Sequence, residues 1–143
     1  DYYSKNIDNE SRPILGAIKF FEWAKSNNIS MAICTNKQER LAIDLLKKIN
    51  LFDYFDCIAG CDTFEFNKPD PRHLTNVVEI IGGDLKKTIM VGDSEVDANS
   101  AHNASIPFVL IENGYTEKKT NEIKHDILIK NFDGFEKIIE KYL

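Results

Sequence analysis

The sequence lacks any apolar run approaching the roughly 18 residues that a membrane-spanning helix needs. It also does not open with the charged, apolar and small-residue pattern of a secretory signal peptide. Its three cysteines are odd in number, stand in apolar surroundings and have no CxxC or HxxxH spacing beside them. We therefore expect buried free thiols of a reducing compartment, with no disulfide framework, no zinc site and no membrane partner, and the cytoplasm is the default location.

Positive charge is in the minority, because 18 Lys and Arg face 23 Asp and Glu, for a net charge of −5. Phosphate backbones are held by clustered basic residues, whereas here these residues are scattered along predicted helices. This balance argues against a nucleic-acid partner and favours a small molecule. Internal repeats and low-complexity linkers are absent too, and 143 residues that are 43% hydrophobic suffice for one domain with a sizeable core.

Predicted strands and helices alternate along the chain. Apolar periodicity predicts helices at about residues 11–26, 38–49, 72–81, 96–104 and 132–143, with a weak polar helix or loop at 118–124. Short apolar runs predict strands at 29–34, 57–60, 88–91, 107–111 and 127–129. This alternation is typical of an α/β fold in which a parallel sheet carries helices on both faces.

An acidic turn follows the strand predicted at residues 88–91, which reads as buried on both faces. The strand stops at Gly92-Asp93, and Asp97 lies one helical turn further on, so that the two carboxylates can face one point. With the Ser94 hydroxyl they offer the hard oxygen ligands that suit Mg²⁺. Asp and Ser are also ordinary residues for a helix N-terminus, so helix capping stays open beside metal binding.

Other polar groups stand where strands end. Thr35-Asn36 follows the strand at 29–34, the Asn113-Gly114 turn follows the strand at 107–111, and Lys68 lies at a rigid elbow before Pro69. Parallel strands share one carboxyl edge, so these groups and Asp93 are expected to meet in one crevice. A hydroxyl, an ammonium and carboxylates holding Mg²⁺ would bind and polarise a phosphoryl group. Taken singly, Thr35-Asn36 could equally be a helix cap and Lys68 a solvated surface charge.

Three segments in this order resemble the second, third and fourth motifs of the haloacid dehalogenase-like (HAD) phosphatases. They are Ile33-Cys-Thr-Asn-Lys37, Lys68-Pro-Asp-Pro71 and Val91-Gly-Asp-Ser-Glu-Val-Asp97. The residues around them are most similar to bacterial phosphoglycolate phosphatases, notably Cys61-Asp-Thr63, Pro107-Phe-Val-Leu110 and Asn113-Gly-Tyr-Thr116. The resemblance runs from about Ile7 to the C-terminus. It implies a Rossmann-like core and a Mg²⁺-dependent phosphomonoester hydrolase for a small phosphorylated metabolite, with 2-phosphoglycolate as the expected substrate.

The resemblance also implies a role for each matching residue. Thr35, with the Asn36 backbone, would hydrogen-bond the phosphoryl oxygens. Lys68 would neutralise charge on the nucleophile and the transition state, which makes Lys68 and Thr35 the expected catalytic residues. Asp93 would bind Mg²⁺ directly, and Asp97 would hold a metal-bound water or orient Lys68.

The family's Asp-x-Asp nucleophile motif is missing, so this chain contains no nucleophile and alone is expected to be inactive. Residues 1–10 resemble the end of a helical cap and its return linker, and residues 11–143 the hydrolase core. In the family, the strand carrying the nucleophile lies between the strands at 29–34 and 88–91. We expect those two strands to stay roughly 10 Å apart, with the space filled by an N-terminal fragment or a second copy of the chain. An aspartyl-phosphate intermediate would then form only in the intact protein.

Two other functions remain open at this point. The first is a non-catalytic phosphate-binding or regulatory module that kept the pocket without the nucleophile. The second is a response-regulator-like receiver domain, which also uses Mg²⁺ and carboxylates on a similar sheet. The receiver domain needs acidic residues after its first strand and does not explain Lys68-Pro-Asp-Pro71.

Overall fold

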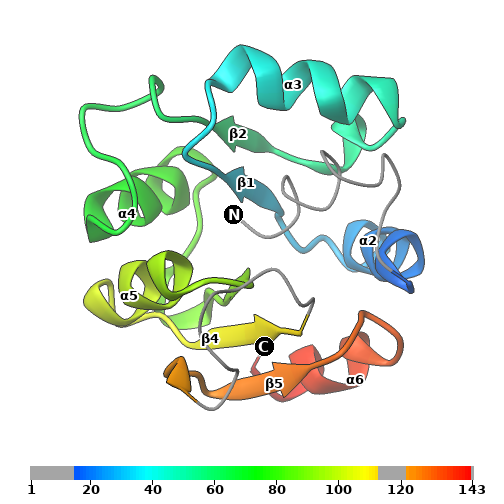
Figure 1. Ribbon diagram of the computed structural model, residues 1–143. Coiled ribbons are helices and arrows are strands. Elements are labelled where there is room, and N and C mark those ends of the chain that lie inside the picture. The colour runs from blue at the N-terminus through cyan, green and yellow to red at the C-terminus, as the bar shows by residue number, and fades with distance from the viewer. Residues whose placement is uncertain (1–14, 113–121, 143) are drawn as a thin grey trace.

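The computed structural model describes residues 15–112 and 122–142, in which helices and parallel strands alternate (Figure 1). The strands are β1 Ala32–Cys34, β2 Cys57–Ala59, β3 Met90–Gly92, β4 Phe108–Ile111 and β5 Ile127–Ile129. The α-helices are α2 Ala17–Ser26, α3 Glu39–Lys48, α4 Pro71–Ile80, α5 Glu95–Asn103 and α6 Phe135–Ile139. Short 3-10 helices are η1 Phe52–Tyr54, η2 Leu85–Lys87 and η4 Glu140–Tyr142.

The strands form two parallel sheets within these residues. One sheet pairs β1 with β2, and the other has the order β3-β4-β5. Figure 1 shows β1 and β2 above β4 and β5. Within the described chain β1 and β3 are not hydrogen-bonded to each other, as expected for strands whose common neighbour is missing.

A cavity of about 240 Å³ lies between the two sheets and is lined by residues of both β1 and β3. Aromatic side chains of α2 and α6 and aliphatic side chains of α4 also line it: Phe20, Phe21, Phe135, Leu74, Val77 and Val78. Val91 lines the cavity and is only half-buried, so the expected burial of this strand on both faces is wrong. The reason is that Val91 borders the cavity between β1 and β3.

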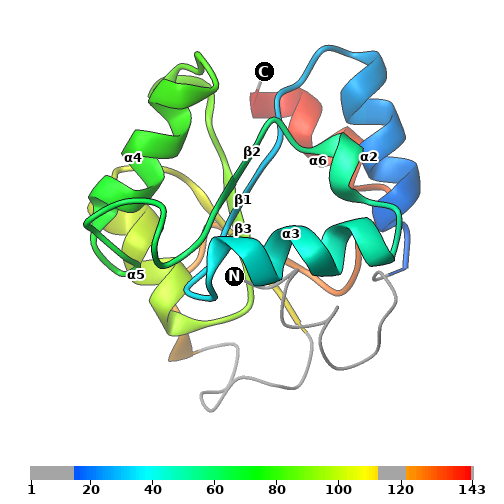
Figure 2. The same ribbon diagram turned by 90° about the horizontal axis from the view of Figure 1, so that it is seen from above.

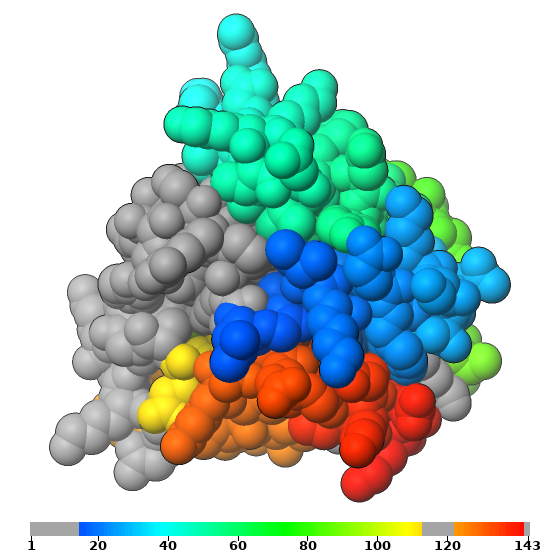
Figure 3. Space-filling view, turned by 90° about the vertical axis from the view of Figure 1, so that its right-hand side faces the viewer, coloured from blue at the N-terminus to red at the C-terminus, as the bar shows by residue number. Residues whose placement is uncertain are grey.

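Helices cover both faces of the strands. Figure 2 shows α4 and α5 on one side of the strands and α2 and α6 on the other. On the α2 side, the Phe20 ring centroid lies 4.8 Å from that of Phe135 and 5.7 Å from that of Phe132. Such aromatic contacts bury large apolar areas and tie α2 to the C-terminal helix. In the space-filling view, α2 accordingly lies beside the C-terminal segment (Figure 3).

Gly16 explains where α2 begins. It has a φ of +81°, and a Cβ there would lie 2.6 Å from the Asp133 backbone nitrogen. Only glycine allows this close approach, which the hydrogen bond from Phe132 N–H to the Leu15 carbonyl also supports (3.0 Å). The helix starts at Ala17, and the entry expected at residues 11–13 lies outside the described residues, as do residues 1–10.

Most element boundaries agree with the sequence within two residues. Helix α3 and strand β5 match closely, whereas β1 begins at Ala32, β3 at Met90 and α6 at Phe135, all later than expected. The side-chain hydroxyl of Thr88 donates to the Asp84 carbonyl at 2.7 Å, which continues the preceding turn, and Gly134 has a φ of +74° before α6. Residues 113–121, including the Asn113-Gly114 turn, lie outside the description. No helix in the described ranges is long and apolar enough to cross a membrane.

Candidate active site

A polar pocket of about 330 Å³ lies at the carboxyl ends of β1 and β3. Its lining brings together all five residues expected from the sequence: Thr35, Asn36, Lys68, Asp93 and Asp97. Lys37, Ser94 and Val96 complete the lining. The predicted convergence on one edge of the fold is therefore confirmed for these five residues, whereas the Asn113-Gly114 turn belongs to the part of the chain that is not described.

Thr35 is held directly after β1 with its hydroxyl in a defined orientation. Its backbone N–H donates to the Ala59 carbonyl at 2.9 Å, which extends the β1–β2 pairing by one residue. The hydroxyl oxygen accepts the Lys37 backbone N–H at 3.1 Å, so the hydroxyl hydrogen can be donated elsewhere. Thr35 is 1% exposed, and its remaining open side is the pocket. A phosphoryl oxygen needs a donor of this kind.

Asn36 uses its side chain and its backbone differently. The side-chain amide donates to the Lys68 carbonyl at 3.1 Å and so ties the loop after β1 to the elbow before α4. Its backbone N–H finds no acceptor among residues 15–112 and 122–142. The Asn36 backbone N–H is thus the group of this residue that is available to an anion.

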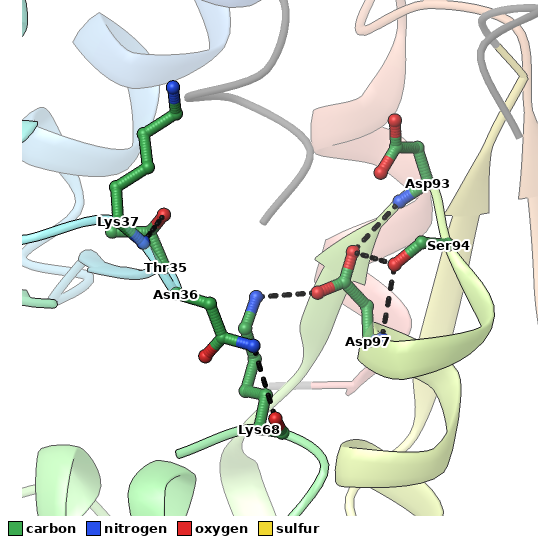
Figure 4. A network of polar contacts seen from close by, with 7 residues as sticks. All are labelled: Thr35, Asn36, Lys37, Lys68, Asp93, Ser94 and Asp97. Carbon is green, nitrogen blue, oxygen red and sulfur yellow. Dashed lines mark hydrogen bonds and ion pairs between the residues drawn. The ribbon is translucent and has the colours of Figure 1, made fainter. Parts of the chain in front are cut away.

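Lys68 and Asp97 form a buried ion pair. The Lys68 Nζ donates to Asp97 Oδ1 at 2.6 Å, and each side chain is 1% exposed (Figure 4). The desolvation cost of burying each charge is offset by its attraction to the opposite charge. The other two ammonium N–H groups of Lys68 have no acceptor within the described chain and remain available to an anion in the pocket.

The second oxygen of Asp97 is also occupied. Asp97 Oδ2 accepts from the Ser94 hydroxyl at 3.0 Å and from the Asp93 backbone N–H at 3.2 Å. Burial alone would raise the pKa of the Asp97 carboxyl, but the adjacent Lys68 ammonium and the hydrogen bond from the Ser94 hydroxyl help to lower it to about 2. Of the two roles expected for Asp97, this geometry supports the orientation of Lys68.

Asp93 stands at the end of β3, is 1% exposed and lines the pocket. Figure 4 shows its carboxylate pointing away from Asp97. No group of three or more acidic, His or Cys side chains that could hold a metal occurs in the described ranges. Mg²⁺ does not need one, because it binds proteins through one or two carboxylates and completes its shell with water and substrate phosphate. Asp93 at the border of this polar pocket fits that pattern.

Three lining residues were absent from the expected site or had another role there. Lys37 directly follows Thr35-Asn36, so its proximity could have been inferred from the sequence. Val96 is 40% exposed and adds an apolar surface that nothing in the pattern distinguished from core residues. Ser94, considered as a metal ligand, instead caps α5 by accepting the Asp97 backbone N–H, which bears out the alternative of helix capping.

Parallel strands between two helical layers, with a polar pocket at their carboxyl edge, define an α/β fold of the kind that binds ligands at that edge. The family model of the haloacid dehalogenase-like hydrolases matches residues 1–111, and the chain belongs to that family. The expectation from the three motifs is thereby confirmed.

Curated relatives carry a common name. The chain is 41% identical to phosphoglycolate phosphatase of Mesorhizobium japonicum over 134 residues, which is 94% of this chain. It is 40% identical to the phosphoglycolate phosphatase of Agrobacterium fabrum over 98% of its length. The chain spans 59% and 62% of these two relatives, respectively.

A solved structure supports the fold. The crystal structure of a predicted phosphoglycolate phosphatase from Haemophilus somnus 129PT superimposes with a TM-score of 0.85 at 26% identity. The match covers 95% of this chain and 61% of that one. The Rossmann-like HAD fold expected from the sequence is thus confirmed.

Proposed function

We propose that this chain works, as part of a full-length protein, in a Mg²⁺-dependent phosphomonoester hydrolase for small phosphorylated metabolites. The observation that carries the proposal is the convergence of Thr35, Lys68 and Asp93 on one polar pocket. 2-Phosphoglycolate is the first candidate substrate, supported by the curated relatives named phosphoglycolate phosphatase.

The residues of this chain bind and orient the phosphoryl group. The Thr35 hydroxyl and the Asn36 backbone N–H donate to its oxygens, and the Lys68 ammonium balances the negative charge that the transition state spreads over them. Asp97 holds Lys68 in place through the 2.6 Å contact. Asp93 would hold Mg²⁺, which supplies further positive charge at the phosphoryl oxygens.

The nucleophile would come from outside this chain, since the sequence contains no Asp-x-Asp motif. An aspartate carboxylate attacks the phosphorus, the alcohol leaves, and water then hydrolyses the aspartyl phosphate. The attacking carboxylate would lie close to the Lys68 ammonium and to a Mg²⁺ held by Asp93, because both positive charges would offset its negative charge.

The cavity between β1 and β3 suits the strand that would carry this aspartate. It is lined by both strands and by apolar side chains of the flanking helices, as a central strand requires. Unpaired backbone groups at two interior edges would otherwise cost about 1–3 kcal/mol for each one that is buried. The strand comes from an N-terminal segment of the same protein or from a second copy, and the greater length of the relatives favours the first source.

A phosphate-release assay with a panel of small phosphoesters tests the activity on the full-length protein, with and without Mg²⁺. Release that requires Mg²⁺ and is fastest with 2-phosphoglycolate is expected. Phosphate binding without release from any ester would favour the alternative, a non-catalytic phosphate-binding or regulatory module. The absence of an Asp-x-Asp motif from this chain is the observation that favours this alternative. Preference for another ester would correct the substrate alone.

The source of the strand has its own test. Co-expression of this chain with a separate N-terminal segment should restore phosphate release, whereas the chain alone should have none. Light scattering of the chain alone distinguishes a second copy, which would double its mass.

The partners and location follow from composition. The charge of −5 and the scattered basic residues speak against nucleic acid. All three cysteines are free, which supports a reducing compartment such as the cytoplasm as the proposed location.

A further inference from the structure

The loop that presents Thr35 is supported by a neighbouring turn. Residues 35–37, here called the phosphate loop, lie against residues 59–63, which follow β2. The Ala59 carbonyl accepts the Thr35 N–H at 2.9 Å, and the Cys61 N–H donates to the Lys37 carbonyl at 2.7 Å. Lys37 in turn orients the Thr35 hydroxyl through its own N–H. The position of that hydroxyl therefore depends on where the 59–63 turn lies.

Thr63 joins this turn to the helix that follows the phosphate loop. Its hydroxyl oxygen accepts the Gly60 N–H at 2.7 Å, and its hydroxyl hydrogen goes to Glu39 Oε1 at 2.9 Å. Glu39 is the first residue of α3 and lies two residues beyond the phosphate loop. The Thr63 side chain thus links the 59–63 turn to the start of α3.

The 59–63 turn packs tightly against the phosphate loop and the start of α3. A Cβ on Gly60 would lie 2.2 Å from the Glu39 nitrogen and 2.5 Å from the Lys37 carbonyl oxygen. Asp62 adds a hydrogen bond from the Glu39 N–H to its Oδ1 at 2.8 Å. Loss of the Thr63 hydroxyl would deprive the buried Gly60 N–H of its acceptor and the Glu39 carboxylate of a donor at once.

We propose that Thr63 is a positioning residue, which sets the phosphate loop so that Thr35 and the Asn36 N–H point at a phosphoryl group. Thr63 acts through Gly60, Cys61 and Lys37 and does not touch the substrate. The kinetic readout of this proposal rests on the proposed phosphatase function. Binding of inorganic phosphate is a second readout, which is independent of that function.

The test compares Thr63→Val with Thr63→Ser, which keeps the hydroxyl, in the full-length protein. Thr75→Val is the control for loss of a threonine hydroxyl elsewhere, because the Thr75 hydroxyl donates to the Arg72 carbonyl within α4. A displacement of about 1 Å in the phosphate loop costs about 100-fold in rate, so Thr63→Val should lower kcat/KM by about 10- to 100-fold. Inhibition by inorganic phosphate should weaken about tenfold, while Thr63→Ser and Thr75→Val stay within about twofold of wild type.

Calorimetric titration with inorganic phosphate separates the two hypotheses. If wild type binds phosphate but hydrolyses no ester, the phosphatase function fails, and weaker phosphate binding by Thr63→Val still supports the positioning role. If Thr63→Val binds phosphate and turns over substrate like Thr75→Val, or if Thr63→Ser is as impaired as Thr63→Val, the positioning role is overturned. If Thr63→Val does not fold, Glu39→Met replaces it, because this change removes the acceptor of the Thr63 hydroxyl. Glu39→Met should then bind phosphate more weakly than Glu39→Gln, which keeps an acceptor oxygen.

Discussion

Lys68 Nζ and Asp97 Oδ1 lie 2.6 Å apart although 29 residues separate them in the chain. Both side chains are buried, and both border the pocket. The pair brings the third and fourth sequence motifs together and directs the ammonium at the site where a phosphoryl group would bind. Under the proposed function, breaking the pair would affect both the folded state and the phosphoryl site.

Asp97→Asn should lower the free energy of unfolding by about 3 kcal/mol, because it leaves the buried Lys68 charge without a counterion. Urea denaturation of the full-length protein measures this change. Asp70→Asn is the control, since Asp70 pairs with Arg72 at the surface, and it should have a much smaller effect. Equal effects of the two substitutions would mean that the Lys68–Asp97 pair contributes little to stability.

His73 should make stability depend on pH. It is fully buried, and burial lowers its pKa below the ordinary value of 6.5. Folding therefore favours neutral His73: its contribution is fully present above about pH 6.5 and is lost as the pH falls further, until the folded protein also binds the proton.

The slope of unfolding free energy against pH between 5 and 7 measures this contribution. His73→Asn can still donate to the Phe66 carbonyl, which His73 Nδ1 contacts at 2.9 Å, and should flatten that slope. An unchanged slope in the variant would assign the pH dependence to other groups.

Thr35→Val should reduce kcat/KM by about 100-fold, the usual effect of removing one donor from a developing negative charge. Thr35→Ser retains the hydroxyl and should keep most of the activity. Steady-state kinetics of the full-length protein check both variants. Comparable activity in Thr35→Val and Thr35→Ser would remove Thr35 from the phosphoryl site.

Asp93→Asn should abolish Mg²⁺-dependent activity while the fold stays nearly intact, because one charge is lost from a metal ligand and the shape is kept. Phosphate release at limiting Mg²⁺ and circular dichroism of the full-length protein measure the two effects. If Asp93→Asn turned over substrate at the wild-type rate at limiting Mg²⁺, Asp93 would be excluded as a direct ligand.

Local patterns in the sequence determined the order of strands and helices, the bounds of α3 and β5 to within one residue, and five of the eight residues that line the pocket. These features could be predicted because apolar periodicity and the placement of polar groups at strand ends are local properties. Boundaries shifted where turn chemistry intervened, as at Thr88, whose hydroxyl bonds to the Asp84 carbonyl before β3, and at Gly134 before α6.

Tertiary structure alone decided how the site is assembled. The Lys68–Asp97 ion pair, the Asn36–Lys68 hydrogen bond and the Thr63–Glu39 contact each join segments 24 to 32 residues apart. The depth at which Asp97 is buried likewise depends on how helices and strands pack. Sequence shows which polar groups exist and where each strand ends, but the direction of a side chain and its burial are set by neighbours that the chain brings together only on folding.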